Sequence, residues 1–220
     1  MSPIRTALFI ALALSAGNVF AAEDISKVNG GIHTESGQTY GDLETVNGSI
    51  HIASGATTDS AGTVNGGISV GGKAVTGKLE TVNGGIKLER DVTVNGGIET
   101  VNGSIFVDRG GKVKDGVETV NGAIGLVATQ LGGGIETVRG DVTVGVDSHV
   151  AGGLRVQKSH GVFNIEPKRD PRIVIGPNAV VEGPLVFERA VKLYVHKTAR
   201  IGAVTGATAQ SFDTPTAPAE

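Results

Sequence analysis

The sequence predicts an all-β, single-domain parallel β-helix, also called a β-solenoid, and three observations point to it. A short unit, Thr-Val-Asn-Gly-Gly/Ser-Ile, recurs about every 18 residues along the chain. Glycine makes up 35 of the 220 residues and aromatic residues only 4%, which disfavours a layered globular core. The apolar residues are mostly Val, Ile, Leu and Ala, which fit a narrow core between short strands.

The asparagine of the unit marks the period. It occurs with a spacing of 18 or 19 residues at Asn29, Asn47, Asn65, Asn83, Asn102 and Asn121. Arg139 takes the same place in a degenerate copy, and Asn95 predicts a second copy of the unit on another face of one rung. Stacked amides can hydrogen-bond to one another as a structural ladder, which we favour, or they can face a saccharide.

Alternation within residues 45–52 predicts a strand, because side chains of a strand point to opposite sides in turn. We expect these side chains to point inward: Val46, Gly48, Ile50 and Ile52. We expect these to point outward: Thr45, Asn47, Ser49 and His51. The small inward glycine would keep the interior thin.

A strand this short is stable when equivalent strands stack ~4.8 Å apart. Asn-Gly could instead mark hairpin turns, but a β-branched Val precedes every repeat Asn-Gly and the pattern never inverts. The handedness of the β-helix stays open, with a slight preference for a right-handed one.

A column of glutamates precedes the repeated Thr-Val-Asn segment, and stacking would bring like charges within about 5 Å of one another. Its members are Glu80, Glu99, Glu118 and Glu136. Repulsion among them would favour a bound cation. The alternative, which we favour, is that they extend into water or pair with lysines such as Lys78 and Lys87.

Residues 1–21 are typical of a secretory signal peptide. They contain Arg5, an apolar run from Ala7 to Leu14, and small residues at Val19 and Ala21 before the expected cleavage site. No later segment is continuously apolar, so we expect no membrane span, and the chain contains no cysteine. These features predict an exported protein, either periplasmic or secreted.

Four segments follow the signal peptide. Residues 22–156 carry the repeats, and residues 157–172 interrupt them with two prolines. A second repeat type in residues 173–206 aligns the segment 175–181 with the segment 195–201 and predicts further rungs. Residues 207–220 are rich in Thr, Ala and Pro and predict a flexible tail.

No chemistry of catalysis is visible. The formal net charge is −3 and no basic block can follow a phosphate backbone, which argues against a nucleic-acid partner. The histidines lie in no metal-ligand spacing and beside no serine nucleophile with an acid; they are His33, His51, His149, His160 and His196. We therefore assign no catalytic, cofactor-binding or metal-binding residue and expect that the protein is not an enzyme.

Three resemblances add expectations. The Glu-Thr-Val-Asn-Gly-Ser-Ile repeats at Glu44 and Glu99 resemble those of exported bacterial β-helix proteins of the adhesin type, which implies a structural or interaction role with an unidentified partner in the cell envelope or outside the cell. Residues 173–206 are similar to rungs of bactofilins, which implies end-to-end self-association into filaments. The segment 175–180 resembles one hexapeptide of left-handed β-helix acyltransferases, an activity that export disfavours.

Overall fold

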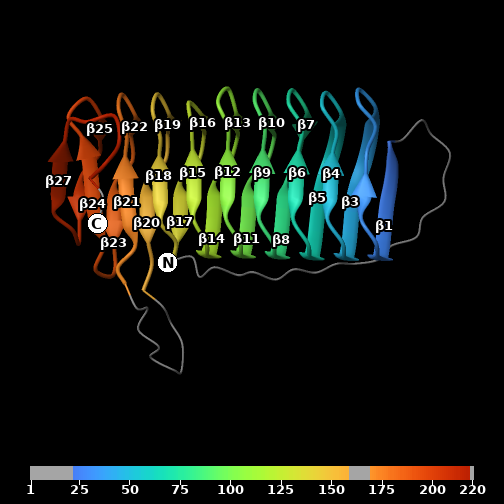
Figure 1. Cartoon of the computed structure of the whole chain (residues 1–220), viewed down its shortest axis with the longest axis horizontal. Helices are drawn as coiled ribbons and strands as arrows, with labels where there is room; N and C mark the ends of the chain where they lie inside the picture. Colours follow the sequence, from blue (N-terminus) through green and yellow to red (C-terminus); the bar gives the residue numbers. More distant parts are fainter. Residues whose placement is uncertain (1–21, 159–168, 219–220) are drawn as a thin grey trace.

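The computed structural model describes residues 22–158 and 169–218. The predicted signal peptide, most of the predicted interruption with His160, and the last two residues lie outside the described part. The described strands pair only in parallel and stack into a solenoid of ten rungs (Figure 1), with no helix in the described part. Equivalent residues such as Asn47 and Asn65 pair 18 positions apart. The predicted fold class is confirmed.

One side of the solenoid is a 10-stranded sheet to which each rung contributes one strand. Its strands, in spatial and sequence order, are β2 (Ile32–His33), β4 (Ile50–Ile52), β6 (Ile68–Val70), β9 (Ile86–Leu88), β12 (Ile105–Val107), β15 (Ile124–Leu126), β18 (Val142–Val144), β21 (Arg172–Ile175), β24 (Lys192–His196) and β27 (Ala209–Phe212).

The other side is a 17-stranded sheet. The first three rungs each contribute one long strand, namely β1 (Glu23–Asn29), β3 (Thr39–Asn47) and β5 (Thr57–Asn65). In later rungs a corner divides this strand. The first parts are β7 (Val75–Thr76), β10 (Thr93–Val94), β13 (Lys112–Val113), β16 (Gln130–Leu131), β19 (His149–Val150), β22 (Val180–Val181) and β25 (Arg200–Ile201). The second parts are β8 (Leu79–Asn83), β11 (Ile98–Asn102), β14 (Val117–Asn121), β17 (Ile135–Thr137), β20 (Leu154–Val156), β23 (Leu185–Phe187) and β26 (Val204–Thr205).

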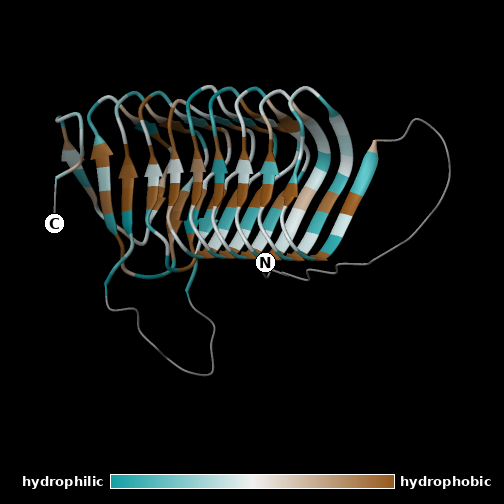
Figure 2. Cartoon of the chain, turned by 45° about the vertical axis from the view of Figure 1, so that its right-hand side comes forward, coloured by the Kyte–Doolittle hydropathy of each residue, from teal (hydrophilic) through white to brown (hydrophobic). Residues whose placement is uncertain are grey.

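Aliphatic columns between the sheets form the core. Ile32, Ile50 and Ile68 occupy one register position in successive rungs and are all buried. Alternation of hydrophobic and hydrophilic residues along the strands is visible in Figure 2. Because every rung repeats the same inward positions, burial of apolar surface stabilises each rung against its neighbours.

A turn with one left-handed residue leads from the 10-stranded sheet into the next rung. Eight successive turns contain a residue whose φ lies between 43° and 80°, namely Gly37, Gly55, Lys73, Asp91, Gly110, Ala128, Asp147 and Asn178. In one of them the Ala74 N–H donates to the Gly71 carbonyl across the turn at 3.3 Å. Glycine, Asn and Asp adopt this conformation with little strain, whereas Lys73 and Ala128 do so at a steric cost.

The predicted interruption does not divide the solenoid. Val142 in β18 pairs directly with Ile173 in β21, although the two residues are 31 positions apart. The segment between β20 and β21 is therefore an insertion within one rung, and the stack continues past it (Figure 1).

The C-terminal segment differs from the expected flexible tail, because β27 lies within it. Its residues pair with β24, and Phe212, only 5% exposed, packs edge-on against His196 with ring centroids 5.1 Å apart. Ala217 packs against the buried cluster that Phe212 forms with Val174 and Tyr194. The open edge of β24 supplies backbone partners that the composition of the tail could not reveal.

Candidate functional site

The repeated asparagines form a continuous hydrogen-bonded ladder along one corner of the solenoid. In five successive steps, Nδ2 of one asparagine donates to Oδ1 of the asparagine one rung earlier, at 2.9 to 3.1 Å. The ladder runs through Asn29, Asn47, Asn65, Asn83, Asn102 and Asn121. An amide carries both a donor and an acceptor, so identical side chains can pair indefinitely. The geometry supports the structural role rather than a saccharide site.

A buried row of threonine hydroxyls lies beside this ladder. Oγ1 of Thr45 donates to the Gly30 carbonyl of the preceding rung at 3.0 Å, and Thr63 does the same to Gly48 at 2.8 Å. The row continues through Thr81, Thr100 and Thr119. Thr45 is only 1% exposed, so the expected outward orientation of this threonine was wrong, and the row cannot form a binding surface.

The orientation differs because the alternation restarts at the corner. Strand β3 ends at Asn47, and the chain turns before β4 begins at Ile50. Val46, expected to point inward, alternates with the buried Thr45 and is only half-buried, whereas Ile50 and Ile52 are buried as predicted. Side chains on either side of a corner need not share one alternating pattern.

From Asn47 onward, the glycine after each ladder asparagine is required by the backbone of the preceding rung. A Cβ added at Gly84 would lie 2.0 Å from the Gly66 carbonyl oxygen, and one added at Gly103 would lie 1.8 Å from that of Gly84. The glycine therefore permits close approach of successive rungs at the corner, rather than thinning the interior as the sequence suggested.

Asn95 lies on a different face, as predicted. Thr93 in the same motif copy pairs with Val75, so Asn95 follows β10 at the corner before β11 rather than joining the ladder. Its backbone N–H donates to the Thr76 carbonyl at 2.7 Å. Among the hydrogen bonds of the described residues, none involves the Asn95 side chain.

The glutamate column lies on the outer face of the 17-stranded sheet. Register pairs bring together Glu80, Glu99, Glu118 and Glu136 in successive rungs. Nζ of Lys78 contacts Glu80 and lies 2.9 Å from Oε1 of Glu99. Hydrogen bonds to these two carboxylates raise the pKa of Lys78 against the opposing effect of burial, which is the largest single influence. Lys87 lies on β9 in the other sheet and does not pair with these glutamates.

The far end of the column has other partners. Nε2 of Gln157 donates to Oε2 of Glu136 at 2.7 Å, and Nε of Arg155 lies 4.0 Å from Oε1 of Glu136. Partial burial, followed by the charges of Glu136 and Glu99, raises the pKa of Glu118, and Lys78 only partly opposes this. Residues 22–158 and 169–218 contain no group of three His, Cys, Asp or Glu side chains that could hold a metal ion.

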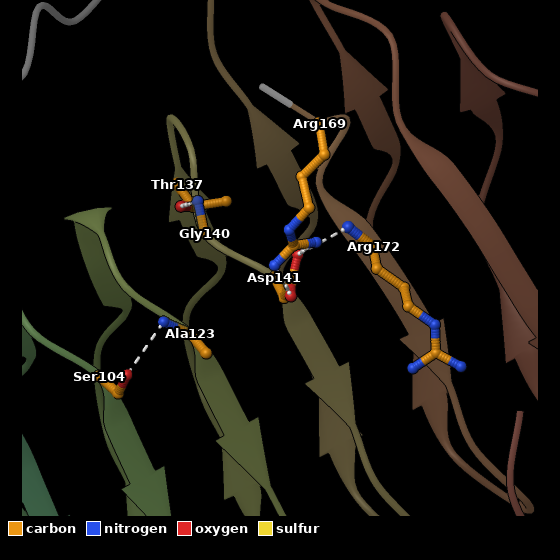
Figure 3. Close-up of polar contacts among 7 residues, drawn as sticks. All are labelled: Ser104, Ala123, Thr137, Gly140, Asp141, Arg169 and Arg172. Atoms are coloured by element: carbon orange, nitrogen blue, oxygen red, sulfur yellow. Dashed lines mark hydrogen bonds and ion pairs between the residues drawn. The ribbon is translucent and has the colours of Figure 1, made fainter. Parts of the chain in front are cut away.

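Beyond the end of the ladder, an ionic cluster forms at Asp141, one residue before β18 and beside Ala123 of the preceding rung (Figure 3). NH1 and NH2 of Arg169 donate to the two carboxylate oxygens of Asp141 at 2.9 and 2.6 Å, and the Arg172 backbone N–H donates to Oδ1 at 2.9 Å. Burial alone would raise the pKa of Asp141, but these hydrogen bonds hold it below its usual value. The cluster fastens the end of the insertion to the stack.

The described histidines are dispersed over the solenoid. His33 and His51 are register neighbours in the 10-stranded sheet, with tilted rings whose centroids lie 6.0 Å apart. Nε2 of His149 lies 2.8 Å from Oε1 of Glu182, and Nδ1 of His196 lies 2.9 Å from Oγ1 of Thr198. Apart from the neighbouring pair His33 and His51, no two of the described histidines are brought together.

Comparisons with known proteins identify no relative of this chain. No protein-family model, curated protein or solved structure matches this chain. Within the described residues, no helix is long and apolar enough to cross a membrane.

Proposed function

We propose that this protein is an exported, non-catalytic structural protein of the bacterial cell envelope or exterior, with an adhesin-like interaction role. The observation that carries the proposal is the continuous stack from β1 to β27, in which each rung pairs in register with its neighbours. Such a stack holds outward side chains in long, regularly spaced columns. A repetitive partner can contact several rungs at once, and weak contacts then sum to useful avidity.

Export is tested by expressing the full chain in a bacterium and separating cytoplasm, periplasm and medium. We expect a mature product that begins at Ala22, identified by its intact mass. Replacing Ala21 with Leu should block cleavage, because the signal peptidase requires a small residue at this position. An uncleaved wild-type chain that stays in the cytoplasm would refute the exported role.

The interaction is tested by co-sedimentation of the purified protein with isolated cell-envelope material. One triple variant changes the outer face of the 17-stranded sheet, with Glu99→Gln, Glu118→Gln and Glu136→Gln. A second changes the 10-stranded sheet, with Ser69→Ala, Lys87→Gln and Phe106→Ala. We expect the wild-type protein to sediment and one variant to lose this binding. Failure of the wild-type protein to bind any envelope fraction would refute the proposal.

A second candidate function is a filament subunit that stacks end to end. The C-terminal rung favours it, since its inward residues Ile201, Val204 and Ala207 are only partly buried. At the opposite end, Lys27 occupies the register position of Thr45 and its Nζ donates to the Gly31 carbonyl at 2.9 Å. An inward charge at an end rung opposes edge-to-edge pairing.

Lys27→Thr would extend the threonine row to the first rung and should increase end-to-end association of the molecules. Val204→Lys should prevent this association. Light scattering and electron microscopy at rising protein concentration would show concentration-dependent rods for the first variant. A monomer at all concentrations for wild type and Lys27→Thr would exclude the filament.

A further inference from the structure

The outer face of the 10-stranded sheet carries no carboxylate along its central column. Register pairing aligns ten residues on the outer side there, namely His33, His51, Ser69, Lys87, Phe106, Gly125, Thr143, Val174, Tyr194 and Gln210. Val174 and Tyr194 are buried in the cluster with Phe212. The corresponding column of the other sheet contains four successive glutamates. The two faces therefore differ in charge, and the first is suited to an uncharged or anionic partner.

Phe106 is an exposed aromatic residue in this column. It is 38% exposed, and it is the single aromatic side chain among the large exposed hydrophobic residues of the described part. A Cβ added at Gly125, the next residue in register, would lie 3.3 Å from Cδ2 of Phe106. The ring thus lies against the glycine of the following rung. A ring supported in this way is a rigid platform for stacking at low entropic cost.

A shallow trough of about 640 Å³ lies beside Phe106 along the solenoid axis. Gly67 and Gly85 line its middle, and Ser49 and Ser104 line its ends. The trough extends from the rung of β4 to the rung of β12, three rung spacings or about 14 Å. Its long axis runs parallel to the solenoid axis, so an extended polymer of several units fits it better than a compact ligand.

Hydrogen-bonding groups line the same trough. Lys87 is the register neighbour of Phe106, and within the described residues its ammonium group has no ion-pair partner. Oγ of Ser69 lies 2.7 Å from Nδ1 of His51, which holds this hydroxyl in place. An aromatic platform, hydroxyl groups and one free cation together match the apolar ring face, the hydroxyls and the carboxylate of a uronic-acid sugar.

We propose that this trough binds a linear acidic polysaccharide, with one sugar ring stacked on Phe106 and a carboxylate paired with Lys87. The proposal rests on the envelope-interaction role above and names the chemical class of its partner. The chain of sugars lies parallel to the solenoid axis, and Ser69 and Ser104 hydrogen-bond to its hydroxyl groups.

The test is calorimetric titration of the full chain with a tetramer of galacturonic acid and, separately, with the neutral cellotetraose. We expect the acidic tetramer to bind more tightly, by about tenfold if one charge-assisted contact is added. Phe106→Ala should weaken binding by about tenfold, and Phe106→Tyr should restore it. Lys87→Gln should remove the preference for the acidic tetramer.

Two matched variants control for the loss of an exposed side chain or charge elsewhere. Val146 is similarly exposed at 37%, and Val146→Ala should leave binding unchanged. Lys114→Gln removes an exposed lysine at the corner between β13 and β14 and should also have no effect. Circular dichroism would verify that all variants remain folded.

The proposal is overturned if the wild-type protein binds neither tetramer, or if Phe106→Ala and Lys87→Gln bind as the wild type does. Equal binding of both tetramers would also overturn it, since the charge contact would then be absent. Retained co-sedimentation with envelope material alongside failed tetramer binding refutes this inference alone. Loss of both refutes the proposed function as well.

Discussion

The rungs from β3 to β15 and those from β18 to β27 are joined by different side-chain contacts. In the first group, asparagines pair with their own copies in the amide ladder through Asn83, and Lys78 with Glu99 is a cross-rung ion pair beside it. In the second group, unlike charges pair across rungs, as Arg155 does with Glu188 at 3.0 Å and Arg169 with Asp141. A repeated polar side chain can hydrogen-bond to its own copies only when it is both donor and acceptor, because a repeated charge repels its own copies.

The glutamate column shows the limit of this rule. Its members repeat like the asparagines, but they depend on unlike partners: Lys78 for Glu80 and Glu99, and Gln157 for Glu136. Glu118, which lies between them, has a raised pKa. Repetition of a charged residue is therefore tolerated on this face at some cost to stability.

The largest expected effect comes from breaking the close approach of rungs at the ladder corner. Gly84→Ala would place a Cβ 2.0 Å from the Gly66 carbonyl oxygen and should destabilise the fold by about 3 kcal/mol or more. Gly62 is the control, since an added Cβ there meets no atom within 4 Å. Gly62→Ala should raise stability by about 0.5 kcal/mol. Urea denaturation would contradict this account if both variants lost equal stability.

Interrupting the self-paired ladder should have the next largest effect. Asn83→Ala removes the bonds to Asn65 and from Asn102, and should cost about 1 to 2 kcal/mol of unfolding free energy. Asn95→Ala removes the same side chain from the same motif but breaks no side-chain hydrogen bond of the described structure. Its denaturation midpoint should match that of the wild type. Equal losses in the two variants would show that the ladder contributes nothing specific.

Breaking an unlike pair tests the C-terminal rungs. Asp141→Asn weakens the contacts to Arg169 and to the Arg172 N–H, and should cost about 1 kcal/mol at neutral pH. Because the folded pKa of Asp141 is lowered, its contribution is present above the unfolded pKa and disappears as the pH falls through the folded value. The stability difference between variant and wild type should therefore shrink in acid. A difference that stays constant with pH would argue against the ionic contact.

The smallest effect is expected where identical charges meet. Glu118→Gln relieves repulsion with Glu99 and Glu136 and should stabilise the fold at neutral pH by about 0.5 kcal/mol. Because the folded pKa of Glu118 is raised, the wild-type protein loses stability as the pH rises through that value. The advantage of the variant should vanish below the unfolded pKa. Thermal unfolding across this pH range would refute the repulsion if Glu118→Gln were less stable at neutral pH.

The sequence by itself determined the period, the fold class and the asparagine ladder. These follow from residues that recur at constant spacing, such as Asn47 and Asn65, because parallel stacking places equal positions side by side. It also placed Asn95 off the ladder. It suggested the glutamate column and its pairing with Lys78, since both depend on the same spacing.

Only the tertiary structure decided the features that depend on the positions of the corners. The inward orientation of Thr45, the backbone contact that requires Gly84, and the left-handed turns through Lys73 all arise at corners, where alternation restarts. The Asp141–Arg169 contact and strand β27 join residues that share no repeat. Local sequence patterns indicate which residues of a strand share a side. These features depend instead on distances between the backbones of successive rungs, which are set only when the rungs stack.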